Sequence, residues 1–223
     1  MGLGEDVDLK HTLDKGCQSL PLFPLPDLVF FPDSWLPLHV FEPRYQALIR
    51  HCLDRDGVLA VPRLKEGWRS NYEGRPAIHE ISGFGRIVQK TELPDGRWFI
   101  TLQGLGRVRI EEELPPDHAF RLAKAEVVPE PGVDESDAQR MVQNIRLMVG
   151  QLLSKGFGAS SGLPMMLEEA RTAVAFVHRV AHACVRDPDE RQVYLELNTL
   201  EQRVEMVSGV LMEVLARTDG YEA

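Results

Sequence analysis

Cysteine is scarce in this chain of 223 residues. The three cysteines, Cys17, Cys52 and Cys184, lie far apart, are odd in number and never form a Cys-x-x-Cys pair. This usage excludes a disulfide framework and favours free thiols in a reducing compartment. The sequence also lacks an apolar run long enough to span a membrane, and residues 1–15 lack the apolar core of a signal peptide. We therefore expect a soluble, cytoplasmic protein without a membrane partner.

Blocks of basic residues are absent as well. The formal net charge is -9, and residues 129–223 contribute most of it, with nine basic and fifteen acidic side chains. Residues 18–128 are nearly neutral, with fourteen basic and fifteen acidic side chains. A chain without a basic block is a poor candidate for binding the phosphates of nucleic acid. The nearly neutral charge of residues 18–128 leaves open the alternative that their basic side chains form a local stripe.

Motifs that carry catalysis are also missing. No Gly-x-x-x-x-Gly-Lys-[Ser/Thr] occurs, so nothing would cradle the phosphates of ATP. His178 and His182 are spaced by one helical turn, but Arg179 stands where a zinc protease has its glutamate, so we expect a solvated or partly buried helix face. Cys52 and Cys184 fall on predicted apolar helix faces and are expected as core thiols. We expect no catalytic residue, no metal, no cofactor and no enzymatic activity.

Residues 18–128 have the pattern of a β-rich domain, after a flexible lead over residues 1–17. Apolar pieces interrupted by prolines predict edge strands and bends over Ser19–Phe31. Leu36–Phe41 predicts a further strand, and Pro43 then suits the first turn of a helix over Arg44–Asp54.

The clearest hairpin joins Ile87–Glu92 to Arg97–Gln103, because Leu93-Pro94-Asp95-Gly96 has turn chemistry. Gly104 and Gly106 predict a sharp bend or bulge directly after it. Glu111–Glu113 is expected to be a solvated strand end. Many short strands with one helix indicate a small, partly open barrel or folded sheet.

The apolar period becomes helical after Pro129–Val133, so we expect a helical domain over residues 134–223. One stripe runs from Met141 to Leu152, and a second helix extends from Pro164 to Cys184. Asp187-Pro188-Asp189-Glu190 is a strong helix start, followed by a stripe from Val193 to Val214 that Asn198 could interrupt. These spacings predict a helical hairpin or bundle.

Several motifs occur together in a recognisable order. Leu20–Tyr45 reads LPLFPLPDLVFFPDSWLPLHVFEPRY, and Gly83–Val88, Leu93–Arg97 and Gln103–Ile110 follow it. Over roughly residues 18–215 the sequence resembles the amino-terminal, substrate-binding domain of Lon-type ATP-dependent proteases. The resemblance implies an α+β fold: a PUA-like mixed or antiparallel β-barrel with one helix, followed by a C-terminal helical bundle. The Lon-like domain of cereblon-type ubiquitin ligase receptors has the same class of barrel.

The resemblance also implies a function. It suggests a non-catalytic module that binds unfolded or damaged polypeptides, as an adaptor in protein quality control with a protease or chaperone partner. Two alternatives stay open. PUA-like barrels include RNA-binding members, although the charge makes nucleic acid unfavourable, and a cleft between barrel and bundle could hold a small molecule.

Five aromatic residues are candidates for peptide binding. Trp35, Trp68 and Tyr72 fall in predicted loops, where amphipathic rings can anchor a peptide or simply cover the edge of the core. Phe41 and Tyr45 flank Glu42-Pro43-Arg44. There a structural interpretation competes, in which both rings pack the strand–helix junction while Glu42 and Arg44 stabilise the helix start.

Overall fold

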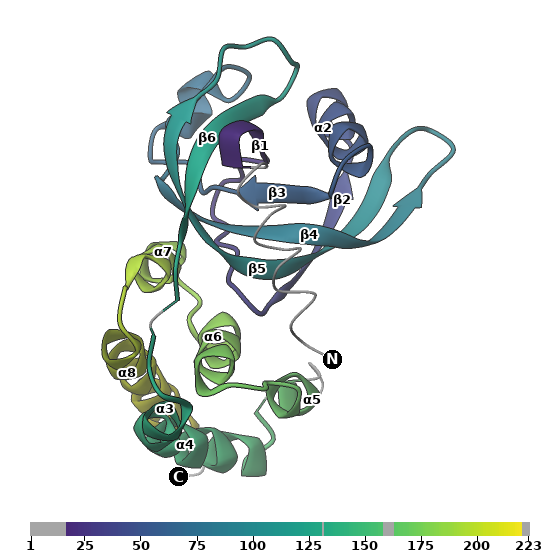
Figure 1. Cartoon of the computed structure of the whole chain (residues 1–223). Coiled ribbons are helices and arrows are strands. Elements are labelled where there is room, and N and C mark those ends of the chain that lie inside the picture. The colour runs from purple at the N-terminus through teal and green to yellow at the C-terminus, as the bar shows by residue number, and fades with distance from the viewer. Residues whose placement is uncertain (1–16, 131, 158–162, 220–223) are drawn as a thin grey trace. The chain divides into compact units, whose positions relative to one another are not determined.

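The computed structural model describes residues 17–130, 132–157 and 163–219. The predicted flexible lead, except for Cys17, lies outside the described residues. The chain divides into two compact units, one ending at Pro129 and the other beginning at Glu130. The fold is mixed α+β, with a sheet in the first unit and helices in the second (Figure 1). Among the described residues, no helix is long and apolar enough to cross a lipid bilayer.

The first unit is built on one six-stranded sheet with the order β2-β5-β4-β3-β1-β6. β6 also pairs with β5, so five strands close into a ring and β2 extends it along the other side of β5. β1 and β3 are parallel, and the other pairs are antiparallel. The elements are η1 (Cys17–Ser19), β1 (Leu20–Leu22), β2 (Trp35–Val40), α2 (Pro43–Leu53), β3 (Val58–Val61), η2 (Trp68–Asn71), β4 (Ile81–Glu92), β5 (Trp98–Glu113) and β6 (Arg121–Val128).

Glycines allow β5 to bend and to pair with three strands, β2, β4 and β6. The register between β4 and β5 shifts by one residue at Leu105, between the pairs Phe84–Gly106 and Gly85–Gly104. A Cβ on Gly104 would lie 2.2 Å from the carbonyl oxygen of Phe31, so only glycine lets the backbones approach this closely. The predicted bulge and the predicted β4–β5 hairpin are both confirmed.

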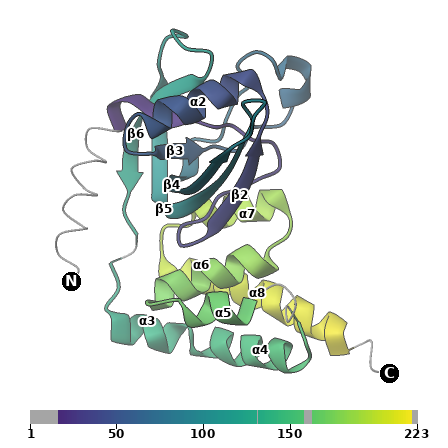
Figure 2. The ribbon, with the colours of Figure 1, turned by 90° about the vertical axis from the view of Figure 1, so that its right-hand side faces the viewer.

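The helix α2 covers one end of the ring (Figure 2). Its buried residues Tyr45, Leu48 and Ile49 join one apolar core with residues of β3 and β5. This helix was predicted from its pattern, and Pro43 occupies its first turn as expected. Glu113, predicted to be solvated, instead pairs through both carboxylate oxygens with Arg121 of the neighbouring strand.

The second unit contains α3 (Glu135–Met141), α4 (Gln143–Ser154), α5 (Leu163–Glu168), α6 (Ala173–Cys184), α7 (Pro188–Glu196) and α8 (Leu200–Asp219). The long helix α8 packs against both α4 and α6. Asp187 caps α7 as predicted, because its carboxylate accepts hydrogen bonds from the backbone N–H groups of Asp189 and Glu190.

Two details of the helical prediction are wrong. The single helix expected from Pro164 to Cys184 is divided into α5 and α6, because the Thr172 hydroxyl accepts a hydrogen bond from Ala175 N–H and starts a new helix. Val193, expected on the inward stripe, is 52% exposed, because the short helix α7 turns Tyr194 and Leu195 inward instead.

Candidate functional site

The strand β2 is the edge of the sheet in the described part of the first unit, since it pairs with β5 alone (Figure 2). Its side chains alternate. Leu36 and Leu38 pack toward the core, and Trp35, Pro37 and His39 point outward. Leucines at every second position therefore fix which face of β2 reaches solvent.

Exposed apolar side chains lie on this edge and on the two strands next to it in the sheet. Trp35 is 41% exposed, Phe41 60%, Val88 40% and Phe99 50%, and they are the large hydrophobic residues that lie open to solvent in the described part of this unit. They belong to β2 or its end, to the bulge in β4, and to β5. His39 lies opposite Phe99 in the strand register, and the two rings stack at 4.6 Å. We call the outward side of Trp35–Phe41, together with Phe99 and Thr101, the β2 face.

A groove of about 370 Å³ crosses the β2 face, lined on its outer side by Pro37, His39, Gln89, Thr91, Phe99 and Thr101. The Thr101 hydroxyl donates a hydrogen bond to the side-chain carbonyl oxygen of Gln89 at 3.2 Å. The lining combines aromatic rings with hydroxyl and amide groups and contains no nucleophile paired with a base. Its chemistry therefore suits binding by apolar contact and hydrogen bonds.

A second aromatic cluster surrounds Arg44 at the start of α2. The guanidinium lies 4.7 Å from the ring centres of both Tyr45 and Tyr72, and its Nε donates to Glu42 Oε2 at 2.9 Å. The Tyr72 hydroxyl donates to Glu42 Oε1 at 2.7 Å, and Trp68 packs edge-on against Tyr72. Burial and the hydrogen bond to Glu42 raise the pKa of Tyr72. The cluster ties η2 to α2, as the structural interpretation of Glu42 and Arg44 predicts.

The structure divides the five predicted aromatic residues between these two places. Trp35 and Phe41 lie on the β2 face, so the loop predicted for Trp35 and the packed junction predicted for Phe41 are wrong. Trp68 lies in η2 rather than in a plain loop, and it joins Tyr72 beside Arg44. Tyr45 is only 6% exposed, and its hydroxyl donates to the carbonyl of Pro24 at 3.1 Å.

The sequence interpretation missed two residues of the β2 face, His39 and Phe99. A signal for both was present. His39 is two residues before Phe41 on the same strand, and Phe99 follows Trp98 in the predicted hairpin. Because strand side chains alternate, burial of Trp98 turns Phe99 outward.

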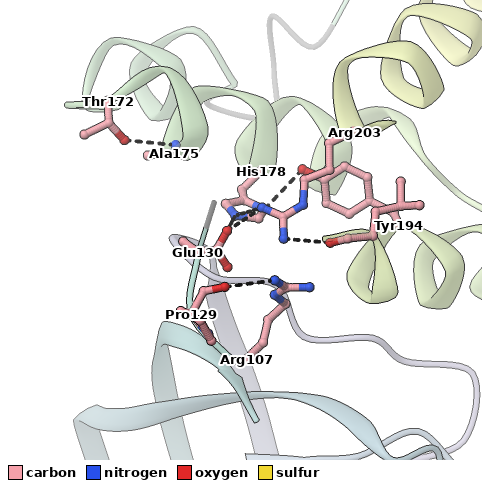
Figure 3. A network of polar contacts seen from close by, with 9 residues as sticks. Arg107, Pro129, Glu130, Thr172, Ala175, His178, Tyr194 and Arg203 are labelled. Atoms are coloured by element: carbon pink, nitrogen blue, oxygen red, sulfur yellow. Dashed lines mark hydrogen bonds and ion pairs between the residues drawn. The ribbon is translucent and has the colours of Figure 1, made fainter. Parts of the chain in front are cut away.

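A buried polar network occupies the helical unit (Figure 3). Arg203, 1% exposed, donates to the carboxylate of Glu130 and, at 3.0 Å, to the carbonyl of Leu197. His178 Nε2 lies 3.4 Å from Glu130 Oε2, and its Nδ1 is within hydrogen-bonding distance, 3.1 Å, of the Tyr194 hydroxyl. Burial alone would raise the pKa of Glu130, but the contacts with His178 and Arg203 outweigh it and lower this pKa to about 2.

This network corrects the prediction of a solvated or partly buried face for His178, which is 1% exposed, whereas His182 is partly buried as predicted. Burial, and the charge of Arg191, also lower the pKa of His182 to about 4. No group of three or more His, Cys, Asp or Glu side chains in the described part of the chain is placed to hold a metal ion.

Comparison with known protein families decides the family. Residues 19–213 match the family described as ATP-dependent protease La (LON) substrate-binding domain. The chain belongs to this family. The match confirms the family that the strand and hairpin motifs indicated.

Related proteins are Lon proteases. The Lon protease of Geobacter metallireducens is 25% identical over 192 residues, which cover 85% of this chain and 23% of the protease. The Lon protease of Desulfosudis oleivorans is 23% identical over 215 residues, which cover 95% of this chain and 26% of that protease. The chain thus spans about a quarter of the length of these relatives.

Two solved structures share the fold. The N-terminal domain of Mycobacterium avium complex Lon protease superposes with a TM-score of 0.67 at 14% identity, covering 87% of this chain and 98% of that one. A Lon N-terminal domain protein from Xanthomonas campestris gives a TM-score of 0.62 at 21% identity, covering 86% of this chain and 98% of that one. At these sequence identities the two superpositions establish a shared fold only.

Proposed function

We propose that the first unit binds extended apolar segments of unfolded or damaged polypeptides along the β2 face. The observation that carries this proposal is the gathering of exposed apolar side chains on and beside the edge strand β2. Exposed apolar residues scattered singly need no explanation, but a cluster on one edge is typical of a binding surface.

The geometry of β2 suits an extended partner. An edge strand offers unpaired backbone groups to which a peptide can add as a further strand, while pockets beside it receive alternate side chains. Pro37 removes one backbone donor from β2, which limits uncontrolled sheet extension. Covering Trp35, Phe41 and Phe99 supplies roughly 1–2 kcal/mol each. Association costs translational, rotational and side-chain entropy, so the net binding free energy is smaller than this sum. We therefore expect dissociation constants of about micromolar or weaker.

The remaining elements of the proposal extend this binding role. We propose that the closed ring of strands is the PUA-like barrel, and that the two units correspond to the β-rich and helical domains expected from the sequence. Trp68 and Tyr72 would widen the contact surface, and buried Tyr45 would support it from the core. The module itself would be non-catalytic and cytoplasmic, acting as an adaptor that passes clients to a protease or chaperone partner. The substrate-binding name of the family supports this role.

The test is a binding titration with a labelled, permanently unfolded protein such as reduced, carboxymethylated α-lactalbumin, read by fluorescence anisotropy. The double variant Phe41→Ser/Phe99→Ser should bind at least about ten-fold more weakly, since two exposed anchors are lost. Leu147→Ser is the matched control, because Leu147 is 62% exposed on α4 in the helical unit. Equal affinity of the double variant and the wild type, or no binding by either, would refute the proposal.

A further inference from the structure

A cavity of about 210 Å³ lies beside the start of α2 and shares no lining residue with the groove of the β2 face. All of its lining residues belong to the first unit. The lining includes three aromatic residues, Tyr45, His118 and Phe120, and three arginines, Arg44, Arg75 and Arg121. The exposed ring of His118 stacks on buried Phe120 at 5.0 Å. The cavity therefore combines aromatic rings with guanidinium groups.

Contacts with one loop place two of these guanidinium groups. Arg44 Nη1 donates to the carbonyl of Tyr72 at 3.1 Å, and Arg121 Nη1 donates to the carbonyl of Pro76 at 2.9 Å. The loop between these two carbonyls contributes to the lining. Burial raises the pKa of the Tyr45 hydroxyl, and the charges of Arg44 and Arg121 act against this effect. Both guanidinium groups are thus close to the phenol that lines the cavity.

The third arginine, Arg75, has hydrogen-bonding capacity to spare. Its Nη1 donates to the carbonyl of Leu114 at 3.2 Å, which is its one hydrogen bond within the described residues. Glu113 lies 3.9 Å from its Nε, but both oxygens of that carboxylate already accept from Arg121. Two arginines therefore share one acid. The Arg75 side chain is 36% exposed, so its remaining N–H groups are open to a ligand.

One carboxylate, that of Glu73, also belongs to the lining. Glu73 is exposed and forms no ion pair in the part of the chain that the structure describes. It does not occupy the place of an anion beside Arg75, although its charge reduces the attraction for one. Solvent screens exposed charges, so this reduction is small.

We propose that this cavity binds a carboxylate attached to an apolar or aromatic group, such as the last residue of a polypeptide or a small aromatic acid. The planar N–H groups of Arg75 suit the two oxygens of a carboxylate. The apolar group packs beside Tyr45 and Phe120. Inorganic phosphate is less favoured, because it leaves the aromatic part of the cavity uncovered. The site is separate from the β2 face, so this inference goes beyond the proposed function.

The experiment titrates ¹⁵N-labelled protein with N-acetyl-L-phenylalanine, with its uncharged amide and with sodium phosphate, at low ionic strength, and follows binding by NMR. The acid should bind with a dissociation constant of about millimolar. The amide and phosphate should each bind at least about three-fold more weakly. The shifted backbone amides should include residues 73–75 and 118–121. A tetrapeptide of three alanines ending in phenylalanine separates the two sources: tighter binding than the acid supports a polypeptide end, and equal binding supports a small acid.

Three variants test the assignment of charge. Arg75→Gln should weaken binding of the acid about three-fold and leave the amide unchanged, because it removes the guanidinium that meets the carboxylate. Glu73→Gln should tighten binding of the acid about two-fold. Arg69→Gln is the matched control, since Arg69 is exposed, lies over the ring of Trp68 outside the lining and loses the same charge.

Four results overturn the proposal. Equal binding of the acid and the amide shows that the cavity does not select a carboxylate. Phosphate that binds as tightly as the acid shows that the apolar group contributes nothing. A loss of affinity in Arg69→Gln as large as in Arg75→Gln makes the effect one of net charge. Shifts confined to residues outside the lining place the ligand elsewhere.

Discussion

Replacing Glu130 by glutamine should destabilise the helical unit in a way that depends on pH. The substitution keeps a hydrogen-bond acceptor but removes the negative charge that faces Arg203 and His178. Arg203 is 1% exposed, so its guanidinium cannot recover hydration when the carboxylate is gone. A buried charge that loses its partner is a strong source of destabilisation.

The size of the effect follows from the pKa. A carboxyl whose pKa is lowered from 4.5 to about 2 contributes at most roughly 3.4 kcal/mol to stability at neutral pH. One third of the Glu130 side chain remains exposed, so solvent screens part of this interaction. We expect Glu130→Gln to lower the free energy of unfolding by about 2 kcal/mol at pH 7.

The sign of the pH dependence is fixed by the same shift. Because the pKa of Glu130 is lower in the folded than in the unfolded chain, its contribution is complete above about pH 4.5 and is lost as the pH falls toward 2. The difference in stability between wild type and Glu130→Gln should therefore be constant from pH 7 to about pH 5, and should shrink between pH 4.5 and 2.

Urea unfolding can assign the effect to the right unit. All three tryptophans, Trp35, Trp68 and Trp98, lie in the first unit, so their fluorescence reports on the sheet while circular dichroism at 222 nm is dominated by the helices. The helical transition should move by roughly 1–2 M urea, and Glu205→Gln, an exposed change on α8, should leave it in place. An unchanged helical midpoint at pH 7, or a difference that does not shrink in acid, would refute the reasoning.

Three further outcomes follow from local geometry. Gly83→Ala should destabilise the sheet by more than about 2 kcal/mol in urea unfolding, because the new Cβ would lie 1.9 Å from the carbonyl oxygen of Phe30. Gly150→Ala on α4 is the contrasting case: its Cβ would lie in open space, so it should raise the free energy of unfolding by about 0.5–1 kcal/mol. Asp187→Ala should lower stability by about 1 kcal/mol, since two backbone N–H groups of α7 lose their cap. Ellman's reagent should react slowly with folded protein at pH 8 and with all three thiols in urea, because the cysteines are buried and burial raises the pKa of Cys52 to about 12.

Local signals in the sequence predicted the elements that local chemistry controls. The turn before Arg97 closes as expected, with Gly96 at a positive φ of 81° and its N–H donating to the carbonyl of Leu93. Asp187 starts α7, and Pro43 starts α2. In each case the deciding interaction joins residues only a few positions apart, so the sequence pattern carries it.

What the sequence could not show depends on residues far apart in the chain. Glu130 and Arg203 are separated by 73 positions, and neither has a periodic signature that points to the other. The break before α6 depends on Thr172 and on Glu135, which accepts from Ala173 N–H across 38 positions. The outward position of Phe41 depends on which face of β2 the core covers.

The central claim, that the β2 face binds polypeptide, is tested most directly by hydrogen exchange with mass spectrometry in the presence and absence of the unfolded client. The account predicts slower exchange of backbone amides in residues 35–41 and 98–103, because a bound segment covers the edge strand and its neighbour. Protection confined to the helices of the second unit, with unchanged exchange in β2 and β5, would contradict it.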